Sequence, residues 1–263
     1  MSIRMVSFVR PSMSLLPRRE FYTILTAVTI IVSLSWYYLV TMAIDMDTMM
    51  SMPNMPPPIW NPQYFLLMFI MWSVMMIAMM LPTAVPTILI YASIFRKARA
   101  EGSSVPPTAI FSSGYLIMWI LFSLAATLLQ WALDEAALLS SMMKINNSLL
   151  AGCFLILAGI YQSSPIKDVC LQHCRSPVRF ISENWRKGFS GSLIMGLHHG
   201  FYCIGCCWLL MSLLFFGGVM SLLWIAGLSL FVLTEKTLPL GLAGARITSG
   251  ILILSGFGVL LTV

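Results

Sequence analysis

Long apolar stretches separated by short polar connections dominate this chain. A helix rises about 1.5 Å per residue, so a hydrocarbon core of about 30 Å requires roughly 20 apolar residues. The stretches that approach or exceed this length are Phe21 to Ile44, Tyr64 to Phe95, Thr108 to Leu133, Asn147 to Gln162, Phe189 to Phe216, Val219 to Leu233 and Ala243 to Val263. We therefore predict an all-α, polytopic transmembrane helical bundle with about seven spans, or six if one of the two short stretches does not cross.

The composition supports this interpretation. Hydrophobic residues make up 59% of the chain and charged residues only 9%, and the mean hydropathy is +0.90. Such values exclude an ordinary soluble domain. Because the polar connections are short, we expect residues 1–263 to form a single integral membrane domain, with its function in the membrane or in short loops.

The distribution of basic residues predicts the orientation. Lys and Arg concentrate on the cytoplasmic side of membrane proteins, and a cytoplasmic N-terminus places every basic residue except Lys144 at or near the inner face. A basic inner loop at 164–188 and a Met-rich outer loop at 45–63 follow from this orientation. The net charge of +6 is then a topology signal, and we expect the lipid bilayer, not nucleic acid, as the partner.

Methionine is the most prominent chemical signal, with 21 residues. A thioether is a soft ligand that suits Cu(I), although Met also fills irregular apolar gaps. Gap filling explains little in an outer loop, so its methionines are candidate copper ligands: Met46, Met49, Met50 and Met52. Helical spacing on the following span groups further candidates on or beside one face: Met68, Met71, Met75, Met76 and Met79.

The fifth apolar stretch carries a dense set of metal-ligand side chains. At about 100° per residue, Met195, His199, Cys203 and Cys206 fall within a stripe about 80° wide, with Cys207 beside it. Ionisable groups in a span usually face the bundle interior and indicate a functional site, although Cys also packs as a small hydrophobe. We predict His199 and the three cysteines as metal ligands.

Depth along the helices predicts where these ligands lie. Counting about 1.5 Å per residue places Met71 to Met76 and Cys203 to Cys207 together in the outer half of the membrane, with Cys153 at a similar level. Cys170, His173 and Cys174 lie in the basic inner segment, where they share one face if that segment is helical. This second set indicates either an exit or sensing site, with reduced thiols, or an ordinary basic helix at the membrane surface.

Three further patterns bear on packing. Gly196 and Gly200 have the spacing that lets two membrane helices approach closely. Pro82 and Pro86 predict a kink in the second span. The adjacent pair Glu235-Lys236 is interpreted as self-compensating and snorkelling to the interface, with an ion or proton role as the alternative.

Known enzyme motifs are missing from the sequence. It has no Gly-rich phosphate loop, no His-Glu-x-x-His and no Ser nucleophile elbow. A membrane thiol-disulfide oxidoreductase using the cysteines of the fifth stretch remains an alternative, although catalytic thiols need access and thiolate character that an apolar span disfavours. An accessory structural subunit of a larger membrane oxidoreductase complex is another.

The chain resembles a bacterial family of metal-binding integral membrane proteins to which no reaction is assigned. The resemblance rests on the segments Met71 to Pro82, Cys170 to Pro177 and Gly196 to Met211, with Gly218 to Met220, Trp224 and Glu235-Lys236. It covers roughly residues 60 to 245 and implies a metal-handling role in a bacterial inner membrane.

From the ligand types we expect the metal to be copper as Cu(I), with zinc in a closed tetrahedral site as the alternative. The expected function is transport, storage or delivery of copper. The expected partners are a membrane metalloenzyme or a periplasmic copper donor.

Overall fold

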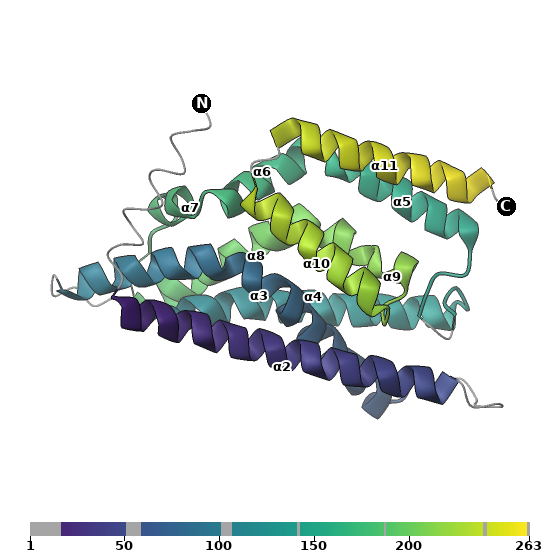
Figure 1. Cartoon of the computed structure of the whole chain (residues 1–263), viewed down its shortest axis with the longest axis horizontal. Helices are drawn as coiled ribbons and strands as arrows, with labels where there is room; N and C mark the ends of the chain where they lie inside the picture. The colour runs from purple at the N-terminus through teal and green to yellow at the C-terminus, as the bar shows by residue number, and fades with distance from the viewer. Residues whose placement is uncertain are drawn as a thin grey trace.

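The computed structural model describes residues 17–50, 59–100, 107–140, 143–186, 188–238 and 241–261. The helices are α2 (Arg18–Met50), α3 (Pro62–Ala100), α4 (Thr108–Glu135), α5 (Ser148–Gln162), α6 (Pro165–Arg175), α7 (Pro177–Glu183), α8 (Gly188–Ser212), α9 (Leu214–Gly217), α10 (Leu222–Thr237) and α11 (Gly241–Leu261) (Figure 1). Within the described ranges, β pairing is limited to an isolated bridge between Leu139 and Ile145. The predicted all-α class is confirmed.

The structure supports five or six spans, and six is the lower of the two numbers that the sequence predicts. Among the described residues, five helices are long and apolar enough to cross a membrane: Arg18–Met46, Pro62–Lys97, Thr108–Glu135, Gly188–Gly217 and Gly244–Leu261. α5 and α6 meet the same criterion only as a pair bent by 62°, which gives up to six. α10 does not qualify because its 16 residues fall short of the roughly 20 that a straight crossing needs.

The outer segment after the first span differs from the expected loop. α2 continues as a helix through Met50, so residues 45–50 of the expected loop at 45–63 are helical. The side chain of Met46 is partly buried against the core. Met52 and the rest of 51–58 lie outside the described residues, and so do the side chains of Met49 and Met50. Copper capture by this segment stays a prediction.

The glycines of α8 allow α4 to approach at backbone distance, as the Gly-x-x-x-Gly spacing predicts. A Cβ placed on Gly196 would lie 2.0 Å from the carbonyl oxygen of Phe111, and one on Gly114 would lie 2.4 Å from the carbonyl oxygen of Leu193. Gly200 is covered by the side chain of Met118. This contact packs the backbone of α4 directly against that of α8.

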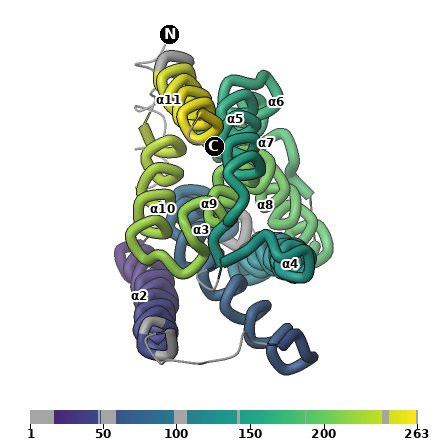
Figure 2. The backbone as a smooth tube through the Cα atoms, turned by 90° about the vertical axis from the view of Figure 1, so that its right-hand side faces the viewer, coloured from purple at the N-terminus to yellow at the C-terminus, as the bar shows by residue number. Residues whose placement is uncertain are grey.

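α5 and α11 form a second pair at one edge of the molecule. Figure 2 shows this pair at one end of the cross-section, with α2 at the opposite end. Gly159 and Gly152 of α5 face α11, and Ser249 Oγ donates a hydrogen bond to the Gly159 carbonyl oxygen at 2.6 Å. Much of the outer side of α11 is apolar and exposed, as expected for a helix that faces lipid.

The segment expected as a basic inner loop, 164–188, contains α6 and α7. α6 packs beside α8, and the path from α5 through α6 to α7 follows the length of the bundle in Figure 1. Ser164 caps α6 by accepting a hydrogen bond from the Lys167 backbone, and Pro165 occupies the first turn. The side chain of Lys167 is only 1% exposed and packs against other parts of the protein, while its position at or near the inner face stays a prediction.

We predict that Gly196→Ala lowers the thermal midpoint of the detergent-solubilised protein. The new methyl group overlaps the Phe111 carbonyl, and such overpacking costs about 1–3 kcal/mol. Gly250→Ala on α11 is the matched control, because a Cβ there meets no atom within 4 Å. Circular dichroism melting curves measure both. Equal midpoints for the two variants would contradict the close α4–α8 contact.

Candidate metal centre

The predicted stripe on α8 is a buried face of the bundle. Met195, His199, Cys203, Cys206 and Cys207 are all buried. His199 lies against rings of α4 and α7, and Cys203 lies against Tyr115 of α4 and Lys236 of α10. Polar groups in a membrane helix are expected to face the interior in this way. The helical spacing therefore identified the buried face of α8.

The cysteines of α6 join this face instead of forming a separate inner site. Cys174 lies within side-chain hydrogen-bonding reach of Cys203 and Cys206. Cys170 is beside Gly205, where an added Cβ would lie 2.7 Å from its Sγ atom. The expected separation of outer and inner sulfur sites is therefore wrong, because α6 runs alongside α8 within the bundle. We refer to Cys170, Cys174, Cys203, Cys206 and Cys207 as the thiol cluster.

Two other residues of the predicted sites do not reach the thiol cluster through their side chains. Cys153 lies in the second turn of α5 and is exposed. His173 stacks on Tyr202 with a ring separation of 4.2 Å, and its Nδ1 atom is 2.8 Å from the Val169 carbonyl oxygen. His173 is thus partly exposed and held by its own helix and by Tyr202.

The thiols are not arranged as a closed metal site. Cys206 and Cys207 each donate a hydrogen bond from Sγ to the Cys203 carbonyl oxygen, at 3.1 and 3.0 Å. Across the described part of the chain, no three His, Cys, Asp or Glu side chains already surround a common point as metal ligands. If Cys206 or Cys207 bound a metal, its Sγ atom would lose the hydrogen bond to the Cys203 carbonyl oxygen.

Lys236 of α10 brings a cation to the thiol cluster. Its Nζ atom donates hydrogen bonds to Cys203 Sγ at 2.8 Å and to Thr83 Oγ1 at 3.2 Å. Tyr115 OH lies 3.2 Å from the same sulfur and donates to the Met80 carbonyl oxygen at 2.9 Å. Cys203 is therefore held between α4 and α10, with an ammonium beside its sulfur.

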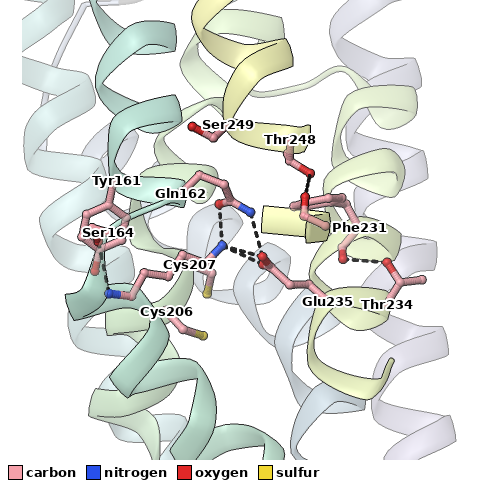
Figure 3. Close-up of polar contacts among 12 residues, drawn as sticks. Tyr161, Gln162, Ser164, Cys206, Cys207, Phe231, Thr234, Glu235, Thr248 and Ser249 are labelled. Atoms are coloured by element: carbon pink, nitrogen blue, oxygen red, sulfur yellow. Dashed lines mark hydrogen bonds and ion pairs between the residues drawn. The ribbon is translucent and has the colours of Figure 1, made fainter. Parts of the chain in front are cut away.

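The interpretation of Glu235-Lys236 as a self-compensating pair is wrong. Glu235 binds Lys167 of α6, with Nζ–O distances of 2.7 and 2.8 Å. Gln162 at the end of α5 contacts both partners, donating to Glu235 at 2.7 Å and accepting from Lys167. Figure 3 shows Gln162 and Glu235 facing one another close to Cys206 and Cys207. The two charges of α10 therefore act on different helices.

Hydrogen bonds around Glu235 hold α5, α6 and α10 together at the break between α5 and α6. Arg175, at the end of α6, donates two hydrogen bonds to the Glu235 carbonyl oxygen, at 2.9 and 2.5 Å. Both ends of α6 are thus attached to one residue of α10, since Lys167 lies in its first turn. These contacts hold Cys170 and Cys174 against α8.

His199 offers a further nitrogen next to the thiol cluster. It is buried and lies among the rings of Phe111, Tyr115 and Phe180, with ring separations between 5.2 and 6.1 Å. Its Nδ1 atom has no hydrogen-bond partner. A buried, unpaired imidazole nitrogen is costly unless it has a use, so His199 remains a candidate ligand.

The methionine stripe of α3 forms part of the buried core. Met71, Met75, Met76 and Met79 are fully buried, and Met68 is nearly so. α3 bends along its course (Figure 1) and contains Pro82 and Pro86. The stripe leads to the thiol cluster because the Met80 carbonyl and Thr83 contact Tyr115 and Lys236. Its sulfur atoms stay predicted ligands.

Sequence reasoning missed Tyr115 and Lys236 as neighbours of Cys203, and Thr83 as a neighbour of Lys236. It also missed Gln130, whose amide contacts both Met68 and Met143. Polar residues inside apolar stretches are the available signal for Gln130 and Tyr115. Nothing in the spacing alone pairs Lys236 with a sulfur on another helix.

The fold and the thiol cluster define an integral membrane protein with a buried, sulfur-rich centre. The chain belongs to the PpoB2 copper chaperone family, whose model matches residues 69–259. The match includes all of the thiol cluster and most of the methionine stripe, so the prediction of a copper-handling membrane protein is confirmed. Comparison with curated proteins and with solved structures gives no match.

Proposed function

We propose that this protein is a Cu(I) chaperone of the bacterial inner membrane, which holds copper on the thiol cluster and delivers it to a copper-requiring partner protein. One observation carries the proposal. Cys174 of α6 meets Cys203 and Cys206 of α8 inside an apolar bundle, next to the Lys236 ammonium. These are soft ligands in a place that excludes competing hard cations and water.

The donor set favours Cu(I) over zinc. Structural zinc takes four ligands in a closed tetrahedron, whereas the described His and Cys side chains form no such group. Cu(I) is stable with fewer ligands, and thiolate and thioether select it. Two cysteines from different helices are sufficient to hold it, and release needs only a small movement of one helix.

The role of Lys236 is to compensate the negative charge of the copper–thiolate group. A Cu(I) ion bound by two thiolates carries a net charge of −1, and burying an unpaired charge in an apolar environment is costly. The Lys236 ammonium, 2.8 Å from Cys203 Sγ, makes the whole group neutral. The nearby Glu235 is paired with Lys167, which leaves Lys236 for the copper–thiolate group.

Supply and delivery follow the distribution of sulfur. The methionine stripe of α3 leads from the outer end of the bundle to the thiol cluster, and neutral thioethers suit transient binding of copper. Met46, Met49, Met50 and Met52 would capture copper at the outer surface, from a periplasmic copper donor. A membrane metalloenzyme is the partner class that would receive it.

Two alternatives fit the thiol cluster less well. A thiol-disulfide oxidoreductase needs thiols that an external partner can reach, whereas Cys203, Cys206 and Cys207 are buried. An accessory structural subunit needs no thiol cluster and no buried counter-cation. If the protein were an accessory structural subunit, the purified chain would have no affinity for copper.

We predict that Cys203→Ser and Cys174→Ser each weaken Cu(I) binding by more than about 100-fold, because loss of a ligand should exceed the roughly 10–100-fold effect of losing an outer-sphere partner. Anaerobic competition titration of the purified protein in detergent measures the affinity. Cys153→Ser is the matched control, since Cys153 is exposed and outside the thiol cluster. Equal effects of all three replacements would contradict the proposed centre.

We predict that Lys236→Gln weakens Cu(I) binding by about 10–100-fold while Lys236→Arg retains most of it, because the cation compensates the copper–thiolate charge without binding copper. The same titration is repeated at high and low salt. Lys144→Gln, which removes an exposed positive charge, controls for net charge. Similar affinities for the Gln and Arg variants would show that compensation is not the role of Lys236.

A further inference from the structure

A second group of soft ligands lies at the other end of α3. The amide nitrogen of Gln130, on α4, is 3.5 Å from Met68 Sδ and 3.2 Å from Met143 Sδ. All three side chains are buried. Met68 comes from the start of α3 and Met143 from the connection between α4 and α5, so segments far apart in the sequence bring two thioethers to one amide.

The orientation of this amide is fixed by Trp72. The indole nitrogen is only a donor, and Trp72 Nε1 donates to Gln130 Oε1 at 2.6 Å. The amide nitrogen must therefore face the two sulfurs. A thioether is a weak hydrogen-bond acceptor, so a buried amide paired with sulfur alone is poorly satisfied. A purely structural contact would gain more from an oxygen acceptor.

The backbone at Met143 is adapted to presenting this side chain. Met143 has a φ of 53°, in the left-handed region, which costs a residue other than glycine of order 1 kcal/mol or more. Its N–H donates to the Ser140 carbonyl oxygen at 2.8 Å, and Ile145 donates to the Phe215 carbonyl oxygen at 2.9 Å. The connection is thus tied to α9 in a strained conformation that directs the Met143 thioether into the bundle.

This group is separate from the thiol cluster. Met68 precedes Met80 by twelve residues, about 18 Å along α3. Gln130 lies one turn before Asp134, which accepts a hydrogen bond from Trp60 Nε1 at 2.6 Å. Trp60 lies two residues before α3, so the two thioethers lie near the end of the bundle from which α3 starts.

We propose that Met68 and Met143 form a second, two-thioether site for a soft monovalent cation, Cu(I), at this end of the bundle. The inference rests on the proposed copper function and adds an entry site to it. Two neutral sulfurs do not compensate the positive charge of Cu(I), and a buried uncompensated charge is costly. Binding is therefore weak, and the ion stays exchangeable and can pass along the methionine stripe. A thioether sulfur has two lone pairs, so Met68 and Met143 each keep one for the metal while the other accepts from the Gln130 amide.

The test uses the full chain in detergent, with Cu(I) supplied anaerobically from a competing chelator. Wild type is expected to bind two Cu(I) per chain, one tightly and one weakly. Cys203→Ser/Cys206→Ser should retain only the weak one. Adding Met143→Leu or Met68→Leu to that background should abolish it, whereas adding Met211→Leu, at a buried methionine of α8, should not.

The outcomes separate this site from the thiol centre. Loss of all copper in Cys203→Ser/Cys206→Ser, or a weak site that survives both Met143→Leu and Met68→Leu, overturns the thioether site and leaves the thiol centre intact. Tight binding that survives the cysteine replacements overturns the thiol centre instead. Met→Leu conserves volume and usually costs less than about 1.5 kcal/mol, and melting curves confirm that each variant is folded.

Discussion

The compensation of buried charge by the adjacent residues Glu235 and Lys236 organises the centre of this protein. An uncompensated charge in an apolar bundle costs several kcal/mol. Glu235 meets this constraint by pairing with Lys167, and the Lys236 ammonium donates a hydrogen bond to the Cys203 sulfur. The Glu235 carboxylate of α10 therefore holds α6, and the neighbouring Lys236 ammonium polarises the Cys203 thiol of α8.

The break between α5 and α6 determines where the thiol cluster forms. Backbone that is not helical is tolerated at membrane depth only where protein satisfies it, and discontinuous helices commonly line binding sites in membrane proteins. Here Ser164 caps α6 and Gln162 contacts Lys167 and Glu235. The bend of 62° directs α6 along α8, so that Cys174 reaches Cys203. A straight helix would have carried the α6 cysteines past α8.

Helical periodicity and hydropathy were enough to predict the all-α membrane bundle, the buried face of α8 and the buried stripe of α3, because each depends on local spacing alone. The close helix approach at Gly196 followed from the same spacing, whereas its partner, α4, did not. The pairing of α6 with α8 could not be predicted, because Lys167 and Arg175 resembled a surface segment in the sequence. Their burial depends on a carboxylate and a carbonyl of Glu235, some 60 residues away along the chain. Tertiary pairing of charges, not local pattern, decided this part of the fold.

The central claim is that cysteines from α6 and α8 bind one Cu(I) ion together. Copper K-edge X-ray absorption of the complex with one Cu(I) per chain tests it most directly. We expect a coordination shell dominated by sulfur. This shell should lose one sulfur scatterer in Cys174→Ser and be unchanged in Cys153→Ser. A shell dominated by nitrogen and oxygen, or one that is identical in both variants, would contradict it.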